Sequence, residues 1–186
     1  MGAEIMPGSS PIFDDAIMEL LKSTKGEVLD IGTGSGKMGK LAKDAGCSPV
    51  HGIEVHQEYI ETYKLKEVYD AVLVGDVRSL TVPGFEVPGG VEFPATFGTV
   101  ILGDSIEHLP KSAGRDLLEF LVIRSKRIIV KYPVNTSNSC LFQGAVGSNP
   151  HEAHVSIWSE ADFVGFDVEH HRNGPMRLAI IKGYTK

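Results

Sequence analysis

Residues 28–39, VLDIGTGSGKMG, contain a glycine-rich turn. The turn joins a short apolar stretch to a segment whose apolar residues are spaced as in a helix. A strand–turn–helix unit of this kind brings backbone N–H groups at a helix start close to a bound ligand. The Walker A pattern, G-x-x-x-x-G-K-[ST], is not met here. Ile31 stands where that pattern needs its first Gly, and Met38 stands where it needs Ser or Thr.

Two other ligand-binding patterns fit the same turn. The dinucleotide pattern G-x-G-x-x-G is matched by spacing at Gly34, Gly36 and Gly39. The pattern acidic-x-G-x-G-x-G is matched from Asp30 through Gly32 to Gly36, with the acid at the end of the apolar stretch. A carboxylate there repels phosphate and suits a ligand that carries an ammonium or sulfonium group. The rest of the chain has to decide between the two patterns.

Apolar runs and helical spacing alternate along most of the chain. Short apolar runs predict strands over 27–31, 50–55, 70–75, 98–103 and 127–132, and helical spacing predicts helices over 11–23, 37–46, 57–66 and 112–123. Residues 163–185 are typical of two strands around an Asn-Gly turn. We therefore expect an α/β fold, a doubly wound and mostly parallel sheet that ends in an antiparallel pair, in a single domain over 1–186.

Two segments depart from this alternation. Residues 85–93, FEVPGGVEF, are nearly palindromic about Pro88-Gly89-Gly90 and predict a small β-hairpin. Residues 133–156 form a long polar loop, and long loops inside compact domains are usually functional. We expect this loop to act as a lid over an acceptor pocket.

Composition excludes several classes of protein. The net charge of −6, without a basic tail, argues against broad binding to duplex nucleic acid. No apolar run approaches the roughly 20 residues that cross a bilayer, so we expect no membrane association. The N-terminus lacks a basic region followed by an apolar core, and Cys47 and Cys140 are the only cysteines. A cytoplasmic location without a disulfide framework is the simplest expectation.

Acidic residues end three successive predicted strands. Asp30 ends the first and Glu54 the second, and Asp76 follows the third. Glu54 sits where a ribose diol would be held, and Asp76 can accept from an exocyclic amine such as adenine N6. Taken singly, each acid can equally cap a helix or stay solvated in a loop. Their joint placement describes a cationic amino acid joined to adenosine, which is S-adenosylmethionine.

These segments resemble the class I S-adenosylmethionine-dependent methyltransferases. The resemblance is carried by VLDIGTGSG, GIEV, VGDVRSL, VILGDSIEHLP and RIIVKYP, and it covers nearly the whole chain. It implies a seven-stranded sheet of order 3-2-1-4-5-7-6 with an antiparallel last strand and the cofactor across the carboxyl ends of the strands. The cofactor contacts that it implies are Asp30, Gly32, Thr33, Gly34, Gly36, Glu54, Val55, Asp76, Val77, Gly103 and Asp104.

A second set of polar residues lies where this fold places acceptor-facing groups. Asp104, Glu107 and His108 share a face if DSIEH forms one helical turn, and His154 begins HVSIWSEADF. These segments resemble the E-x-x-E-H and H-x-x-x-W-[ST]-x-x-x-F elements of Hen-type small-RNA 2′-O-methyltransferases. The first element also resembles quinone-pathway O-methyltransferases. The Hen-type resemblance implies a divalent metal held by Asp104, Glu107, His108 and His154, with Asp104 one methylene shorter than the family's Glu.

The same residues have an interpretation without metal, which we prefer. An EHL element after the fourth strand is widespread in this superfamily, where Glu or His caps the turn and packs. Beyond packing, Glu107, His108 and His154 are the candidate catalytic residues, because an oxygen or nitrogen acceptor of high pKa needs a base or a metal. Two further alternatives are a nicotinamide-dependent oxidoreductase and a non-catalytic adenosylmethionine-binding subunit.

The sequence does not name the methyl acceptor. The acidic charge favours a small molecule, whereas the Hen-like segments favour an RNA terminus. We expect a monomer or a homodimer.

Overall fold

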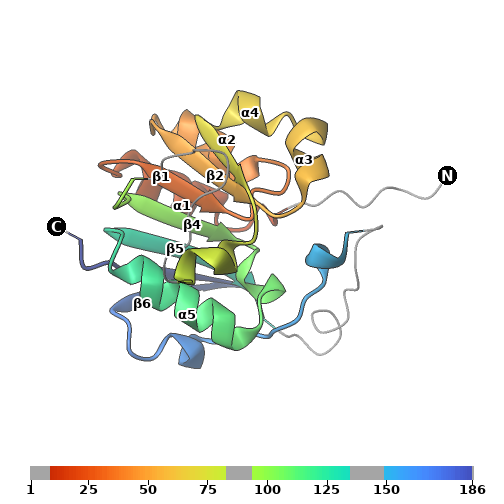
Figure 1. Ribbon diagram of the computed structural model, residues 1–186. Coiled ribbons are helices and arrows are strands. Elements are labelled where there is room, and N and C mark those ends of the chain that lie inside the picture. The colour runs from red at the N-terminus through yellow and green to blue at the C-terminus, as the bar shows by residue number, and fades with distance from the viewer. Residues whose placement is uncertain (1–8, 83–93, 135–148, 186) are drawn as a thin grey trace.

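The computed structural model describes residues 9–82, 94–134 and 149–185. In these residues seven strands form one sheet of order β3-β2-β1-β4-β5-β7-β6 (Figure 1). The strands from β3 to β5 pair in parallel, whereas β7 runs antiparallel to both β5 and β6. The predicted α/β class, strand order and antiparallel last strand are therefore confirmed.

The helices and strands follow the predicted alternation closely. Their bounds are α1 Asp14–Lys22, β1 Val28–Ile31, α2 Lys37–Asp44, β2 Val50–Glu54, α3 Gln57–Thr62, α4 Leu65–Val68, β3 Ala71–Val74, η1 Val77–Thr81, β4 Thr99–Gly103, η3 Ile106–His108, α5 Lys111–Val122, β5 Arg127–Pro133, η4 Pro150–Glu152, η5 Glu160–Phe163, β6 Val168–Asn173 and β7 Met176–Lys182, where η marks a 3₁₀ turn.

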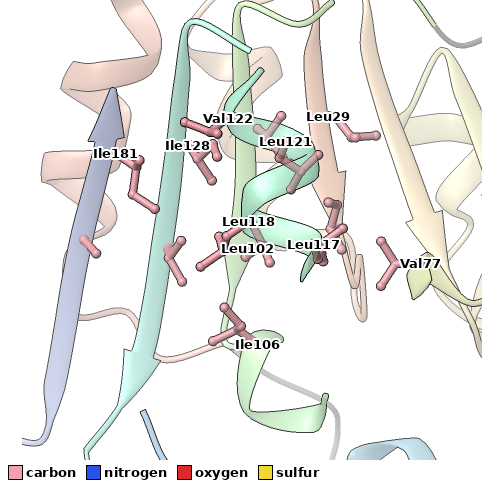
Figure 2. Close-up of a cluster of buried hydrophobic side chains, with 14 of the residues drawn as sticks. Leu29, Val77, Leu102, Ile106, Leu117, Leu118, Leu121, Val122, Ile128 and Ile181 are labelled. Atoms are coloured by element: carbon pink, nitrogen blue, oxygen red, sulfur yellow. The ribbon is translucent and has the colours of Figure 1, made fainter. Parts of the chain in front are cut away.

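Apolar side chains cover both faces of the sheet. On one face, α5 packs through Leu117, Leu118 and Leu121 against residues of β1, β4 and β5 (Figure 2). On the other face, α1 contributes Ile17 and Leu21, and α2 and α4 pack beside it. Strands β1, β2 and β4 are buried at every residue, as expected for parallel strands between two helical layers.

The helix expected over 57–66 is broken in two. Helix α3 ends at Thr62 and α4 begins at Leu65, because Lys64 between them adopts a left-handed backbone with φ 51°. Ile60 before the break and Leu65 after it are both buried in the same core. The hydrophobic pattern therefore continues across the break and could not reveal it.

Two predicted features fall largely outside the described residues. The hairpin expected over 85–93 lies entirely outside the described residues. The middle of the loop expected over 133–156 lies outside them as well. None of the helices in the described ranges has the length and apolar character needed to cross a membrane.

The register of the central strands places their ends at one edge of the sheet. Ile31 pairs with Ile53 of β2 and with Leu102 of β4. The glycine-rich turn, Glu54 and Gly103 therefore leave the sheet at the same level. This alignment creates the edge on which a ligand site can form.

Candidate functional site

A cavity of about 610 Å³ opens at the carboxyl ends of the strands. Its volume lies in the range of sites that hold small molecules and cofactors. Most of the predicted cofactor contacts line it, namely Gly32, Thr33, Gly34, Glu54, Val55, Asp76, Val77, Gly103 and Asp104. Asp30 and Gly36 are not among its lining residues.

The turn after β1 needs glycine for two separate reasons. Gly32, Gly34 and Gly36 all have positive φ, which lets the chain turn sharply between β1 and α2. Gly32 is also crowded, since a Cβ there would lie 2.8 Å from Cβ of Ser105. Gly39 has a different role, because the ring of Tyr69 packs where its side chain would be. Packing against Tyr69 therefore explains why glycine stands at Gly39, the third glycine of the dinucleotide pattern.

Glu54 holds the glycine-rich turn against β2. Its side chain is 4% exposed, and Oε2 accepts from Thr33 Oγ1 at 3.1 Å and from the Gly34 N–H at 2.9 Å. Oε1 accepts from the His56 N–H at 2.8 Å. A carboxylate has about four acceptor sites, so these three bonds leave room for a ligand hydroxyl. Glu54 lines the cavity and is placed for that role.

Asp30 lies beneath the turn and not on the cavity wall. Side chains alternate along β1, so Leu29 and Ile31 face α5 while Asp30 faces the α2 and α4 layer. There its Oδ2 accepts from the Tyr69 hydroxyl at 2.5 Å. Burial raises the pKa of Asp30 to about 7, with Tyr69 opposing the rise and Glu54 adding to it. Direct contact between Asp30 and a ligand ammonium does not fit this position.

Asp76 lines the cavity but is already paired. It caps η1 by accepting from the Arg78 N–H at 2.9 Å, and it forms an ion pair with the Arg78 guanidinium. The hydrogen bond from Arg78 lowers the pKa of Asp76 below its usual range. Contact with an adenine amino group remains a prediction.

On the acceptor side, three of the predicted residues come together. Ligand atoms of Glu107, His108 and His154 all lie within 4.8 Å of one another, and the two imidazole rings are 4.9 Å apart. The turn η3 presents Glu107 and His108. The backbone carbonyl of Glu107 then accepts from the N–H groups of Val155 and Ser156, which brings His154 beside them.

Burial sets the protonation states in this cluster. It raises the pKa of Glu107 well above its usual range, with Asp104 adding to the rise, and it lowers the pKa of His108. Burial therefore favours the neutral form of both side chains. His108 Nδ1 lies 3.2 Å from the Ala153 carbonyl, to which only an N–H can donate. In the neutral ring, Nε2 then carries the lone pair.

The cluster also suits a divalent cation. Glu107 Oε2 is buried and has no hydrogen-bond partner in the part of the chain that the structure describes. One carboxylate and two imidazoles are donors that Mn²⁺ and Zn²⁺-like ions accept. A cation would supply the missing partner of that oxygen and would favour ionised Glu107.

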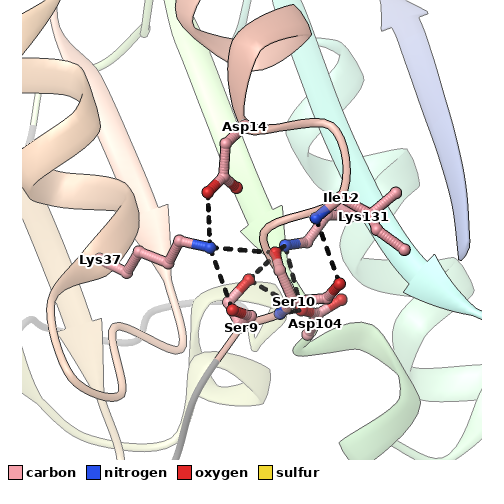
Figure 3. Close-up of polar contacts among 7 residues, drawn as sticks. All are labelled: Ser9, Ser10, Ile12, Asp14, Lys37, Asp104 and Lys131. Atoms are coloured by element: carbon pink, nitrogen blue, oxygen red, sulfur yellow. Dashed lines mark hydrogen bonds and ion pairs between the residues drawn. The ribbon is translucent and has the colours of Figure 1, made fainter.

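Asp104 does not join this cluster. Its Oδ2 accepts from Ser9 Oγ at 2.7 Å and the Ser10 N–H at 2.8 Å, and it lies 3.1 Å from Lys131 Nζ (Figure 3). Its backbone is left-handed, with φ 56°, and its N–H donates to the carbonyl of Lys131. Three of the four predicted metal ligands therefore come together, and Asp104 stays apart from them.

Several residues of the cavity were not predicted from the sequence. Ser9, Ser10, Lys37 and Asn149 line it. For Ser9, Ser10 and Lys37 the sequence offered one signal, which is the lysine inside the apolar run RIIVKYP, Lys131. Asn149 donates to the Tyr59 hydroxyl at 3.0 Å, and that hydroxyl donates to Glu152 at 3.1 Å, which fastens the end of the long loop to α3.

Comparison with known proteins identifies the fold. No protein-family model and no curated protein matches this sequence. Among solved structures, an O-methyltransferase family protein from Burkholderia thailandensis is 13% identical with a TM-score of 0.63. That match covers 94% of this chain and 56% of the other, so the present chain spans about half the length of that relative.

Two further structures match over most of both chains. The methyltransferase domain of bacterial Hen1 is 20% identical, with a TM-score of 0.62 and coverage of 94% of this chain and 100% of that domain. The glycopeptide N-methyltransferase MtfA, complexed with S-adenosylhomocysteine, is 14% identical, with a TM-score of 0.64 and coverage of 96% and 91%. This chain has the fold of class I S-adenosylmethionine-dependent methyltransferases.

Proposed function

We propose that this protein is an S-adenosylmethionine-dependent methyltransferase that acts on an oxygen or nitrogen acceptor of a small molecule. The observation that carries the proposal is a shared cavity. The glycine-rich turn, Glu54 and Asp76 line the same cavity as Glu107, His108 and His154. A subunit that only bound the cofactor would not need the second group, so this arrangement favours an enzyme over a binding module.

When bound, the cofactor supplies an activated methyl group on a sulfonium. The protein's part is then to orient the acceptor in line with that methyl group and to exclude water. His108 is the candidate base, because its neutral ring offers Nε2 to an acceptor proton. The cofactor would supply the methyl group to the acceptor atom, and Nε2 of His108 would take up the proton that the acceptor releases. His154 is the candidate orienting group.

Calorimetric titration with S-adenosylhomocysteine and with NAD tests the cofactor. We expect saturable binding of S-adenosylhomocysteine and none of NAD, because the carboxylates of Glu54 and Asp76 on the cavity wall would repel a pyrophosphate. Binding of NAD without a response to S-adenosylhomocysteine would overturn the proposal in favour of an oxidoreductase. A screen of labelled cofactor against small hydroxyl and amine acceptors, with short RNA as the competing class, then identifies the acceptor.

Metal assistance is a second candidate mechanism. It is favoured by Oε2 of Glu107, which has no hydrogen-bond partner among the described residues and lies next to His108 and His154. A cation held there would lower the pKa of an acceptor hydroxyl and replace a protein base. Activity with a strong chelator, before and after adding Mn²⁺ or Mg²⁺, separates the two mechanisms. Activity lost in chelator and restored by metal supports assistance, whereas full activity in chelator supports His108 as the base.

A further inference from the structure

The chain that follows residue 148 joins two parts of the cavity wall. We call residues 149–156 the connecting segment. Its first end is hydrogen-bonded to the Tyr59 hydroxyl of α3. At its other end, the N–H groups of Val155 and Ser156 donate to the carbonyl of Glu107, at 2.9 and 3.1 Å. The connecting segment therefore links α3, which follows β2, to the turn η3 on the acceptor side.

Hydrogen bonds, and not apolar packing, hold the connecting segment in place. None of its residues belongs to the hydrophobic clusters of the described chain, and Val155 is 54% exposed. Asn149 is 3% exposed, and both polar ends of its side chain are used. Nδ2 donates to the Tyr59 hydroxyl, and Oδ1 accepts from the His151 N–H at 3.0 Å. The attachment to α3 therefore depends on a single hydroxyl, which also donates to the carboxylate of residue 152.

Tyr59 is a rigid attachment point. Its ring packs against the core on the α1 and α2 side of the sheet. The ring lies edge-on to His56 and to Tyr63, with centroids 4.5 and 5.3 Å apart. Burial raises the pKa of Tyr59 to about 12, so the hydroxyl keeps its proton and can donate to Glu152 while it accepts from Asn149. Ring packing therefore fixes where the hydroxyl holds the connecting segment.

A short turn carries this attachment to His108. The turn η4 separates Asn149 from Ala153, and Pro150 restricts the backbone at its start. The Ala153 carbonyl then lies 3.2 Å from Nδ1 of His108. A bond from Nδ1–H to this carbonyl leaves the lone pair on Nε2. Both mechanisms considered above need that lone pair, because a neutral imidazole takes up a proton or binds a cation through it.

We propose that Tyr59 is a positioning residue for His108. Its hydroxyl holds the connecting segment where the Ala153 carbonyl selects the Nδ1–H tautomer of His108. Tyr59 does not line the cavity itself, so it acts through the connecting segment. The task of His108 in methyl transfer rests on the proposed function. Its tautomer and the stability of the connecting segment, in contrast, are properties of the protein without ligand and can be measured there.

The tautomer of His108 tests the proposal directly. Nitrogen NMR chemical shifts, recorded without ligand and with a chelator at pH 8, distinguish Nδ1–H from Nε2–H, and His108→Gln assigns the signals. We expect Nδ1–H to predominate in the wild type. In Tyr59→Phe the ratio of Nδ1–H to Nε2–H should fall roughly threefold or more, because the bond that favours Nδ1–H is weakened. Tyr184→Phe makes the same change at a position that is 64% exposed and should leave the ratio unaltered.

Hydrogen exchange tests the attachment itself. Amide exchange at residues 151–153, which lie in and just after η4, should become roughly fivefold faster or more in Tyr59→Phe and stay unchanged in Tyr184→Phe. Asn149→Ala removes the same bond from the other side. Tyr59→Phe should therefore change the exchange rates less in an Asn149→Ala background than in the wild type. If Tyr59→Phe fails to fold, a lower tautomer ratio in Asn149→Ala supports the proposal, and an unchanged ratio overturns it.

Each outcome decides the proposal. A lower tautomer ratio together with faster exchange in folded Tyr59→Phe supports it. An unchanged ratio would overturn it even if exchange became faster, because Tyr59 would then hold the chain without affecting His108. A lower ratio with unchanged exchange would overturn the route through the connecting segment. If the wild type does not bind S-adenosylhomocysteine, the proposed function fails, and the tautomer ratio still decides whether Tyr59 positions His108.

Discussion

Asp30 shows how a single buried carboxyl links the stability of the fold to pH. Its pKa rises from 3.8 to about 7, chiefly because burial penalises the charged form. The folded pKa is thus higher than the unfolded one, so the unfolded chain releases this proton first as pH rises. The stability associated with protonated Asp30 is fully present below pH 3.8 and is lost as pH rises through about 7.

We therefore predict that Asp30→Asn makes the free energy of unfolding less dependent on pH. The Asn carbonyl can still accept from Tyr69, but no charge has to be buried. Urea denaturation at pH 5 and at pH 8 should show the variant gaining stability relative to wild type at the higher pH. The control Asp44→Asn, at an exposed position of α2, should follow the wild-type curve. A variant that loses more stability than wild type between the two pH values would contradict this account.

Glu54 combines two roles in one side chain, since it holds the turn and lines the cavity. Glu54→Gln keeps the volume but removes the charge that a ribose hydroxyl would meet. We predict a loss of S-adenosylhomocysteine affinity of roughly tenfold or more, measured by calorimetry. Glu58→Gln is the matched control, because the Glu58 side chain is 83% exposed. Unchanged affinity in a folded Glu54→Gln would place the ribose elsewhere.

At the scale of elements, the contact between α5 and Trp158 positions the acceptor side. Trp158 is 1% exposed, and its indole N–H donates to Ser156 Oγ at 2.8 Å. Ser156 in turn contacts the backbone carbonyl of Glu107. Gly114 of α5 permits the approach, since a Cβ there would lie 2.5 Å from Cζ2 of Trp158. Packing of one helix is thereby transmitted to Glu107 and His154.

Gly114→Ala should therefore destabilise the protein by up to about 2 kcal/mol. Overpacking costs about 1–3 kcal/mol, and a gain of about 1 kcal/mol in helix propensity offsets part of that cost. Ser112→Ala, on an exposed turn of the same helix, should be neutral or stabilising. Trp158 is the only tryptophan, so its fluorescence during urea denaturation reports the shift directly. Equal stability of the two variants would contradict this prediction, because it would show that Trp158 moves aside from residue 114 without cost.

At the scale of the whole molecule, a ligand at the strand ends should stabilise the entire sheet. The cavity draws residues from β1, β2, β4 and the segment after residue 149, so binding should oppose global unfolding. S-adenosylhomocysteine at a hundredfold excess over its Kd would contribute about 2.7 kcal/mol. In a chain of this length, that corresponds to a rise in Tm of roughly 5–10 °C. Thermal denaturation should show this rise, and NAD at the same concentration should leave Tm unchanged.

Local patterns in the sequence predicted most of the elements. Apolar runs of four to six residues indicated the buried strands, and the glycine-rich turn indicated where a ligand would meet them. Such signals are local, because burial of a strand and the sharp turn at Gly32 depend on neighbouring residues. The break at Lys64 escaped them, since Ile60 and Leu65 fill one core on either side of it.

The sequence by itself determined the elements, the edge of the sheet that holds the site, and the residue types that gather there. Only the tertiary structure decided which charges face the cavity. Asp30 turns toward Tyr69, 39 residues away, and Lys131 meets Ser9 across 122 residues. The physical reason is that secondary structure follows from preferences within a few residues. The partner of a buried charge, in contrast, depends on which layers of the fold close over it.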